Sequence, residues 1–132
     1  MRLLLSILFI IISFNAIAFG QNILSVSQTA KNSWTDDQGT YTVWDVVLKN
    51  NCDQTIYGAT LVAEKNSLGL RRDQDIWELD HQYDNVYSLP SAVGDYGIKV
   101  RESHSFGYIN KGTKPAIFNI ADIAFTSKSK GY

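Results

Sequence analysis

The sequence is poor in the residues on which disulfide frameworks and zinc sites depend. It has one cysteine, Cys52, and two histidines, His81 and His104. A lone cysteine excludes an internal disulfide, so the domain must be stabilised by packing, with Cys52 either a small buried hydrophobe or one half of an intermolecular bridge. Two histidines are too few to indicate zinc, and no glycine-rich phosphate motif is present. The sequence predicts no cofactor.

No excess of charge of one sign points to a partner. The chain has 12 basic and 13 acidic residues, a formal net charge of −1, and the basic residues are scattered. Nucleic acid is therefore not an expected partner. Asp73 and Asp75 begin a calcium-loop pattern, but Trp77 and Glu78 follow where an EF-hand needs an oxygen ligand and a glycine. No metal site is predicted.

Long apolar runs are also missing, except at the N-terminus. Met1 and Arg2 precede an apolar run over residues 3–14, and Ala18-Phe19-Gly20 places small residues where a signal peptidase cleaves. The run is short for a membrane span, which needs about 20 residues. We expect a signal peptide over residues 1–20, a single domain over residues 21–132, secretion to the extracellular space and no membrane span.

The rest of the chain alternates strand-forming segments with polar or glycine-bearing turns, and no stretch has a convincing helical period. This pattern predicts an all-β fold, an antiparallel β-sandwich of about seven to eight strands. The expected strands are Ile23–Ala30, Thr40–Lys49, Thr55–Lys65, Asn85–Leu89, Gly97–Val100, His104–Asn110 and Ala116–Thr126.

Strand parity separates the aromatic residues of the stretch NSWTDDQGTYTVW, residues 32–44. Successive side chains point to opposite faces of a sheet, and Asp45 and Lys49 would be costly in the core. The even positions from Thr42 to Leu48, including Trp44, therefore form the core face. Tyr41 is expected to point to solvent on the other face with Val43 and Val47.

The side on which Trp34 lies depends on the turn. With two or four residues between Thr35 and Thr40, Trp34 lies opposite Tyr41 and shares its outer face. With a one-residue bulge at Gly39, the pairing shifts by one and Trp34 turns inward. The core parity of Leu24 and Val26 favours the bulge unless another irregularity intervenes. Both alternatives stay open.

A third aromatic region is the charged segment Arg71–Pro90, which is long for a sandwich connection and carries Trp77 among acidic residues. A tryptophan there either plugs one end of the core or contacts a ligand. The carboxylates lie together on one polar segment rather than face each other across a cleft, as a glycosidase requires. Nothing near Cys52 in sequence suggests activation by a base. We therefore predict no catalytic residues and no enzyme.

Three stretches resemble the family 49 carbohydrate-binding modules. Ser27–Lys65 resembles the opening of these modules, SHSFGYI over Ser103–Ile109 resembles a later signature, and PAIFNIADIAF over Pro115–Phe125 resembles the closing strand. The resemblance implies a β-sandwich that binds cellulose and occurs at the ends of endoglucanases or as a stand-alone secreted protein. It also implies that Trp34, Tyr41 and Trp77 are the carbohydrate-binding residues, with Trp34 turned outward.

The sequence therefore predicts a secreted, non-catalytic module that binds cellulose or another β-glucan polysaccharide in an extracellular coat or matrix. The aromatic rings would stack on the C–H faces of sugars while polar neighbours take the hydroxyl groups. The alternative is an extracellular protein-interaction or adhesion β-sandwich that uses the same aromatic patch for a matrix protein.

Overall fold

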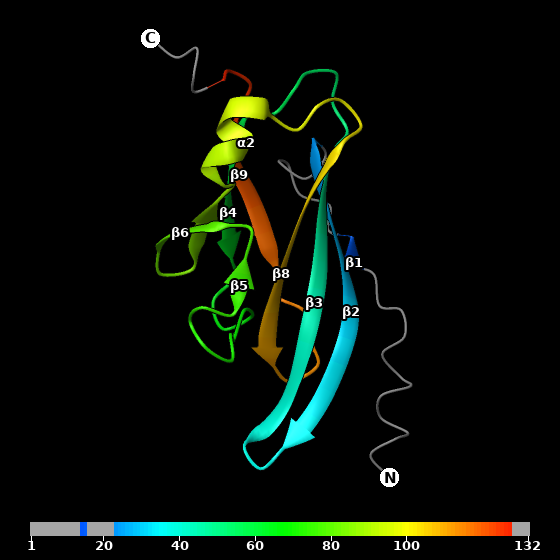
Figure 1. Ribbon diagram of the computed structural model, residues 1–132, viewed down its shortest axis with the longest axis vertical. Helices are drawn as coiled ribbons and strands as arrows, with labels where there is room; N and C mark the ends of the chain where they lie inside the picture. The colour runs from blue at the N-terminus through cyan, green and yellow to red at the C-terminus, as the bar shows by residue number, and fades with distance from the viewer. Residues whose placement is uncertain (1–13, 16–22, 128–132) are drawn as a thin grey trace.

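The computed structural model describes residues 14–15 and 23–127, which form two antiparallel sheets (Figure 1). The strands and the short helix are β1 (Phe14–Asn15), β2 (Leu24–Asp36), β3 (Gly39–Asn50), β4 (Gly58–Ala63), β5 (Ile76–Trp77), β6 (Asp80–Tyr83), β7 (Val86–Ser88), α2 (Ser91–Tyr96), β8 (Ser103–Lys111) and β9 (Phe118–Ala124). The predicted all-β sandwich is confirmed. Within the described residues, no helix is long and apolar enough to cross a membrane.

One sheet has the strand order β1-β2-β3-β8-β5, and the other has the order β6-β7-β4-β9. Their facing sides enclose the core, where Phe106 on β8 meets Phe118 on β9 edge to face with ring centroids 5.4 Å apart. Trp44 on β3 lies fully buried beside Tyr108, as strand parity predicted. The face of the five-stranded sheet that turns away from this core is called the outer face below.

Buried polar groups in the core are hydrogen-bonded to one another, which offsets the cost of removing them from water. The Tyr108 hydroxyl donates to Gln28 Oε1 at 2.6 Å and accepts from the Ala116 backbone N–H at 2.7 Å. The Gln28 amide in turn donates to the Ala116 carbonyl at 2.6 Å. Burial raises the pKa of the Tyr108 hydroxyl. This network joins β2 and β8 to the segment that leads into β9.

Three predicted features differ in the structure. A six-residue helix, α2, follows Pro90, and so short a segment cannot show a helical period. The strand expected at Gly97–Val100 is only an isolated bridge between Ile98 and Ile56. The segment Arg71–Pro90 is not a simple connection, because it contains β5 and β6 as well as the expected β7. β5 pairs with β8, β7 pairs with β4, and β6 pairs with β7 at the edge of the four-stranded sheet.

The predicted leader over residues 1–20 lies outside the described residues except for β1. Phe14 and Asn15 of β1 pair with Gln28 and Ser27 at the outer edge of β2. The proposed cleavage after Gly20 therefore stays a prediction, and it would remove β1 from the edge of the sheet.

Candidate functional site

The β2–β3 hairpin places Trp34 on the outer face by a bulge that the sequence did not reveal. Two residues, Asp37 and Gln38, connect Asp36 to Gly39, and Trp34 pairs directly with Tyr41. The register shifts between Ala30 and Asn32, so the inward parity of Leu24 to Ala30 is reversed before the chain reaches Trp34. The alternative with two or four residues between Thr35 and Thr40 is the correct one, with four, and the irregularity lies at Lys31 rather than at Gly39.

Tyr41 also belongs to the outer face, but it is only 6% exposed. The Trp34 ring lies 5.6 Å from the Tyr41 ring, centroid to centroid, at an angle of 39°. The Arg71 guanidinium carbon lies 5.5 Å from the centroid of Trp34. The expectation that Tyr41 is open to solvent is therefore wrong, because Trp34 from the neighbouring strand packs against it and Arg71 from the loop before β5 lies beside it.

Trp77 reaches the same outer face from β5. In the pairing of β5 with β8, Ile76 lies opposite the buried Tyr108 and Trp77 lies opposite Gly107. Paired residues share a face, so Trp77 points outward with Gly107 and with Asp45, the β3 partner of Gly107. Trp77 is 42% exposed and is not a plug over the end of the core.

The Trp77 indole packs directly against the backbone at Gly107. A Cβ atom at Gly107 would lie 2.5–2.7 Å from Cζ2, Cε2 and Nε1 of Trp77. Three ring atoms at nearly equal distance show that the indole lies against the backbone of β8, and any larger residue would push it away. A glycine inside a well-formed strand often marks such a close approach, so Gly107 within SHSFGYI is the feature of the sequence that points to it.

The outer face therefore carries Trp34 and Trp77 at opposite corners. They are separated by three strand spacings and four residues along β8, which corresponds to about 20 Å. Between them lie Val43 and Ile109, a directly paired and half-buried aliphatic couple. The structure thus places both tryptophans on one surface. This surface, formed by Trp34, Val43, Ile109 and Trp77, is called the platform below, and Tyr41 packs beneath its Trp34 end.

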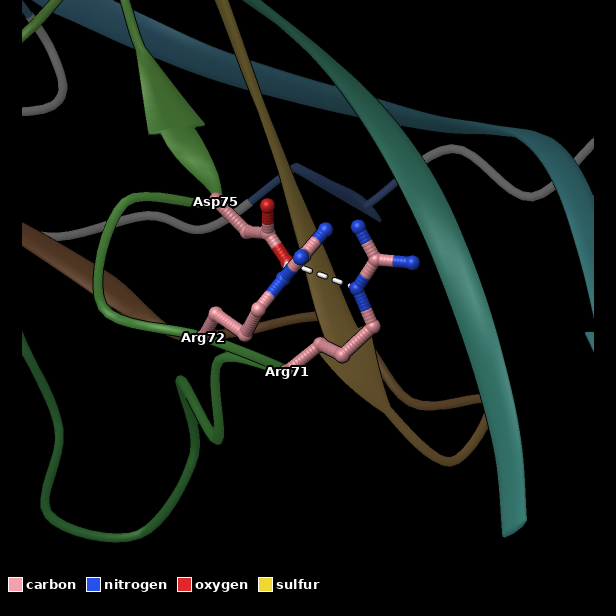
Figure 2. Close-up of polar contacts among 3 residues, drawn as sticks. All are labelled: Arg71, Arg72 and Asp75. Atoms are coloured by element: carbon pink, nitrogen blue, oxygen red, sulfur yellow. Dashed lines mark hydrogen bonds and ion pairs between the residues drawn. The ribbon is translucent and has the colours of Figure 1, made fainter. Parts of the chain in front are cut away.

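Ion pairs among Arg71, Arg72 and Asp75, together called the lock below, fix the loop that borders the platform. Asp75, 8% exposed, accepts a hydrogen bond from Arg71 Nε at 2.7 Å, and Arg72 Nε lies 3.4 Å from the same oxygen (Figure 2). The Arg71 N–H donates to the carbonyl of Ile109, and the Ile109 N–H donates to the carbonyl of Asp75. The loop is thereby fastened to the edge of β8, and Arg71 is held over Trp34.

The lock shifts the acid–base properties of both partners. The hydrogen bond from Arg71 lowers the pKa of Asp75 below its ordinary value of 3.8, against the opposing effect of burial. The same hydrogen bond raises the pKa of Arg71. Asp75 is thus paired with the two arginines, and its place in the loop has a structural explanation.

Asp75→Asn is expected to destabilise the fold by about 1.5–3 kcal/mol at pH 7, the range for a charge-assisted hydrogen bond. Because folding lowers the pKa of Asp75, its contribution is fully present above pH 3.8 and is lost as pH falls below that value. Urea unfolding at pH 7, 5 and 3 should show the difference from wild type shrinking only at pH 3. Asp73→Asn, at an exposed position in the same loop, is the control and should stay close to wild type. An undiminished difference at pH 3 would contradict the assignment.

Cys52 and Asn50 have structural positions away from the platform. Cys52 is half-buried, and its thiol lies 3.0 Å from Asn50 Oδ1 and 3.2 Å from the Gln54 carbonyl oxygen as a donor to both. The Asn50 amide is fully buried and donates to the carbonyls of Gln54 and Ile98. Within the described residues, no group of three or more His, Cys, Asp or Glu side chains is arranged to hold a metal ion.

Comparison with known proteins adds a family. Residues 24–112 match the family model described as carbohydrate binding domain CBM49. A curated relative, stalk-specific protein A of Dictyostelium discoideum, is 28% identical over 107 residues, which cover 77% of this chain and 66% of the relative. The chain thus spans just under two thirds of that relative's length. No solved structure matches the chain. The matched range includes all three predicted site residues, although their contact with a ligand stays a prediction.

Proposed function

This chain belongs to the family of carbohydrate binding domain CBM49, and from that premise we propose that it binds cellulose or a closely related β-1,4-glucan without catalysing a reaction. The observation that carries the proposal is the platform, where two indole rings from distant parts of the chain lie on one sheet face. The sugar chain would run diagonally across β3 and β8 from Trp34 to Trp77.

The chemistry of the platform suits a β-linked glucan. The pyranose rings of such a chain present C–H groups on their faces, which stack on aromatic rings, while their hydroxyl groups point sideways to polar neighbours. Val43 and Ile109 supply further apolar surface between the tryptophans. Tyr41 contributes mainly by supporting Trp34, because little of its ring is open to solvent. This division of roles refines the predicted set of Trp34, Tyr41 and Trp77.

The expected affinity for a short oligosaccharide is modest. The exposed indole of Trp77 contributes roughly 1–2 kcal/mol by partial burial and stacking, and the half-buried indole of Trp34 contributes no more than that. Two such rings supply about 2–4 kcal/mol, which only offsets the at least about 4 kcal/mol lost with translational and rotational freedom. Hydrogen bonds from polar neighbours must supply the rest, so a Kd of about a millimolar or weaker is expected for a short oligosaccharide. A polymer offers many equivalent positions, and retention on an insoluble surface is therefore stronger than the oligosaccharide affinity suggests.

We further propose that the protein is secreted and acts in an extracellular coat or matrix. The N-terminal sequence supports export, because residues 1–20 have the charge, apolar run and small residues of a signal peptide. The name of the relative from Dictyostelium discoideum refers to a stalk, which is consistent with a structural role. N-terminal sequencing of the exported protein should give Gln21 as the first residue.

A pull-down on insoluble cellulose, xylan and chitin tests the binding proposal. We expect the purified chain to be depleted from solution by cellulose more than by xylan or chitin, and to be released by soluble cello-oligosaccharide. Binding to a matrix protein that cello-oligosaccharide does not displace, without depletion by any polysaccharide, would replace the proposal by the adhesion alternative.

A further inference from the structure

A hollow of about 530 Å³ opens beside the Trp34 end of the platform. It is lined by Asp36, Gln38, Tyr41, Arg71, Arg72 and Lys111. Three of these six side chains are cationic and only one is anionic. The whole chain, by contrast, has a formal net charge of −1. With Asp75, which pairs with both arginines, three cations meet two carboxylates, so the hollow has a small local excess of positive charge on a protein that is not basic.

The fold builds this excess of positive charge from three separate segments. Lys111 ends β8 and pairs with Tyr41 on β3, so its position at the rim is fixed by the sheet register. Arg71 and Arg72 come from the loop that the Asp75 lock fastens to β8. Asp36 comes from the β2–β3 turn, where its Oδ1 accepts the Gln38 N–H at 2.8 Å. The charges therefore meet only in the folded protein.

The three cations differ in how far they are already engaged. Arg71 is held by Asp75 at 2.7 Å and stacks over Trp34, so it is a structural member of the lining. Arg72 contacts the same Asp75 oxygen at 3.4 Å through Nε, but its side chain is 59% exposed. Lys111 is exposed, and no ion pair is described for it within residues 23–127. Arg72 and Lys111 are the groups that have capacity for a ligand.

We propose that this hollow is an anion-binding subsite of the carbohydrate platform. It takes the carboxylate of an acidic sugar unit in an otherwise neutral glucan. The inference rests on the proposed function, because the neutral part of the chain is held by the platform. The guanidinium of Arg72 offers paired N–H donors that match a planar carboxylate, and Lys111 adds a point charge beside it. Asp36 in the same lining opposes this attraction.

The test compares wild-type binding to two celluloses that differ only in oxidation of the C6 hydroxymethyl groups to carboxylates. We expect the carboxylated cellulose to bind about tenfold more tightly at low salt, as one or two charge-assisted hydrogen bonds allow. This difference in affinity between the two celluloses should disappear at about 1 M NaCl, where the screening length is about 3 Å. Binding to the neutral cellulose should change little with salt.

Four variants locate the effect. Lys111→Gln should remove most of the tenfold preference and leave binding to neutral cellulose unchanged, and Arg72→Gln should also remove most of the preference. Asp36→Asn keeps an oxygen acceptor for the Gln38 N–H and should increase the preference, because it removes the opposing charge. Lys99→Gln is the matched control, since Lys99 is exposed but lies near the start of β8, far from Lys111 at its end. It should leave the preference intact.

Equal binding of the two celluloses by the wild type would overturn the subsite. So would a loss of preference in Lys99→Gln as large as in Lys111→Gln, because the preference would then reflect general charge attraction. Neither result affects the proposed function, because that depends on neutral cellulose and on Trp77. If neutral cellulose is not bound, or is bound equally well by Trp77→Ala, the platform itself is refuted.

Discussion

Trp77→Ala is expected to lower the affinity for insoluble cellulose by about tenfold or more, because it removes the exposed indole of the platform, a stacking surface worth roughly 1–2 kcal/mol. The thermal unfolding midpoint should change little, since the indole is partly exposed and lies on the outer face rather than in the core. Depletion isotherms together with calorimetric unfolding measure both quantities. A large loss of stability would instead identify Trp77 as a structural residue.

Gly107→Val tests the same point without removing any aromatic residue from the sequence. A side chain at Gly107 would occupy the space of the Trp77 indole, which lies 2.5 Å from the position of the added Cβ. We expect cellulose binding to fall about as far as in Trp77→Ala, and the double variant to bind no more weakly than either single one. Additive losses would show that Gly107 and Trp77 act independently.

Trp34→Ala should also weaken binding, but with a greater cost to the fold than Trp77→Ala. Trp34 covers Tyr41 and supports Arg71, so its removal exposes one ring and takes away the stacking partner of a cation. A loss of about 1–2 kcal/mol in the free energy of unfolding is consistent with these contacts. The two tryptophans thus differ in structural role although they share one face.

Trp44→Ala is expected to produce the largest loss of stability, about 3–5 kcal/mol. Trp44 is fully buried, stacks beside Tyr108 and donates from Nε1 to Asn110 Oδ1 at 2.9 Å. Removal of the ring leaves a cavity and an amide oxygen without its donor. A loss of this size is a large part of the 5–15 kcal/mol that typically stabilises a domain, and should lower the unfolding midpoint by about 15 °C or more.

Trp44→Phe separates the two contributions and guards against outright unfolding. It keeps an aromatic ring in the core but loses the hydrogen bond to Asn110, so a loss of about 1–3 kcal/mol is expected. Cellulose binding per folded molecule should equal that of the wild type, because Trp44 faces away from the platform. Reduced binding by a fully folded Trp44→Phe protein would contradict the assignment of the two sheet faces.

The assignment of the fold and of the core face followed from local patterns. Alternation of apolar and polar residues along Thr42 to Leu48 predicted the buried side of β3, and all its even positions are buried. This works because side-chain direction in a strand has a period of two and needs no knowledge of the neighbouring strand. The family resemblance likewise rested on residues within the range that matches the family model.

The family resemblance implied that Trp34 is turned outward, which the register of β2 and β3 confirms, but tertiary structure decided how the three predicted site residues are displayed. The bulge at Lys31 turned Trp34 outward, cover by Trp34 and Arg71 closed Tyr41 off from solvent, and pairing of β5 with β8 laid Trp77 on Gly107. The register of the β2–β3 hairpin sets the first outcome, while contacts between segments far apart in the chain, Arg71 with Trp34 and β5 with β8, contribute to the others. By itself, therefore, the sequence determined a carbohydrate-binding sandwich with aromatic candidates, while the packing of distant strands determined which rings are displayed.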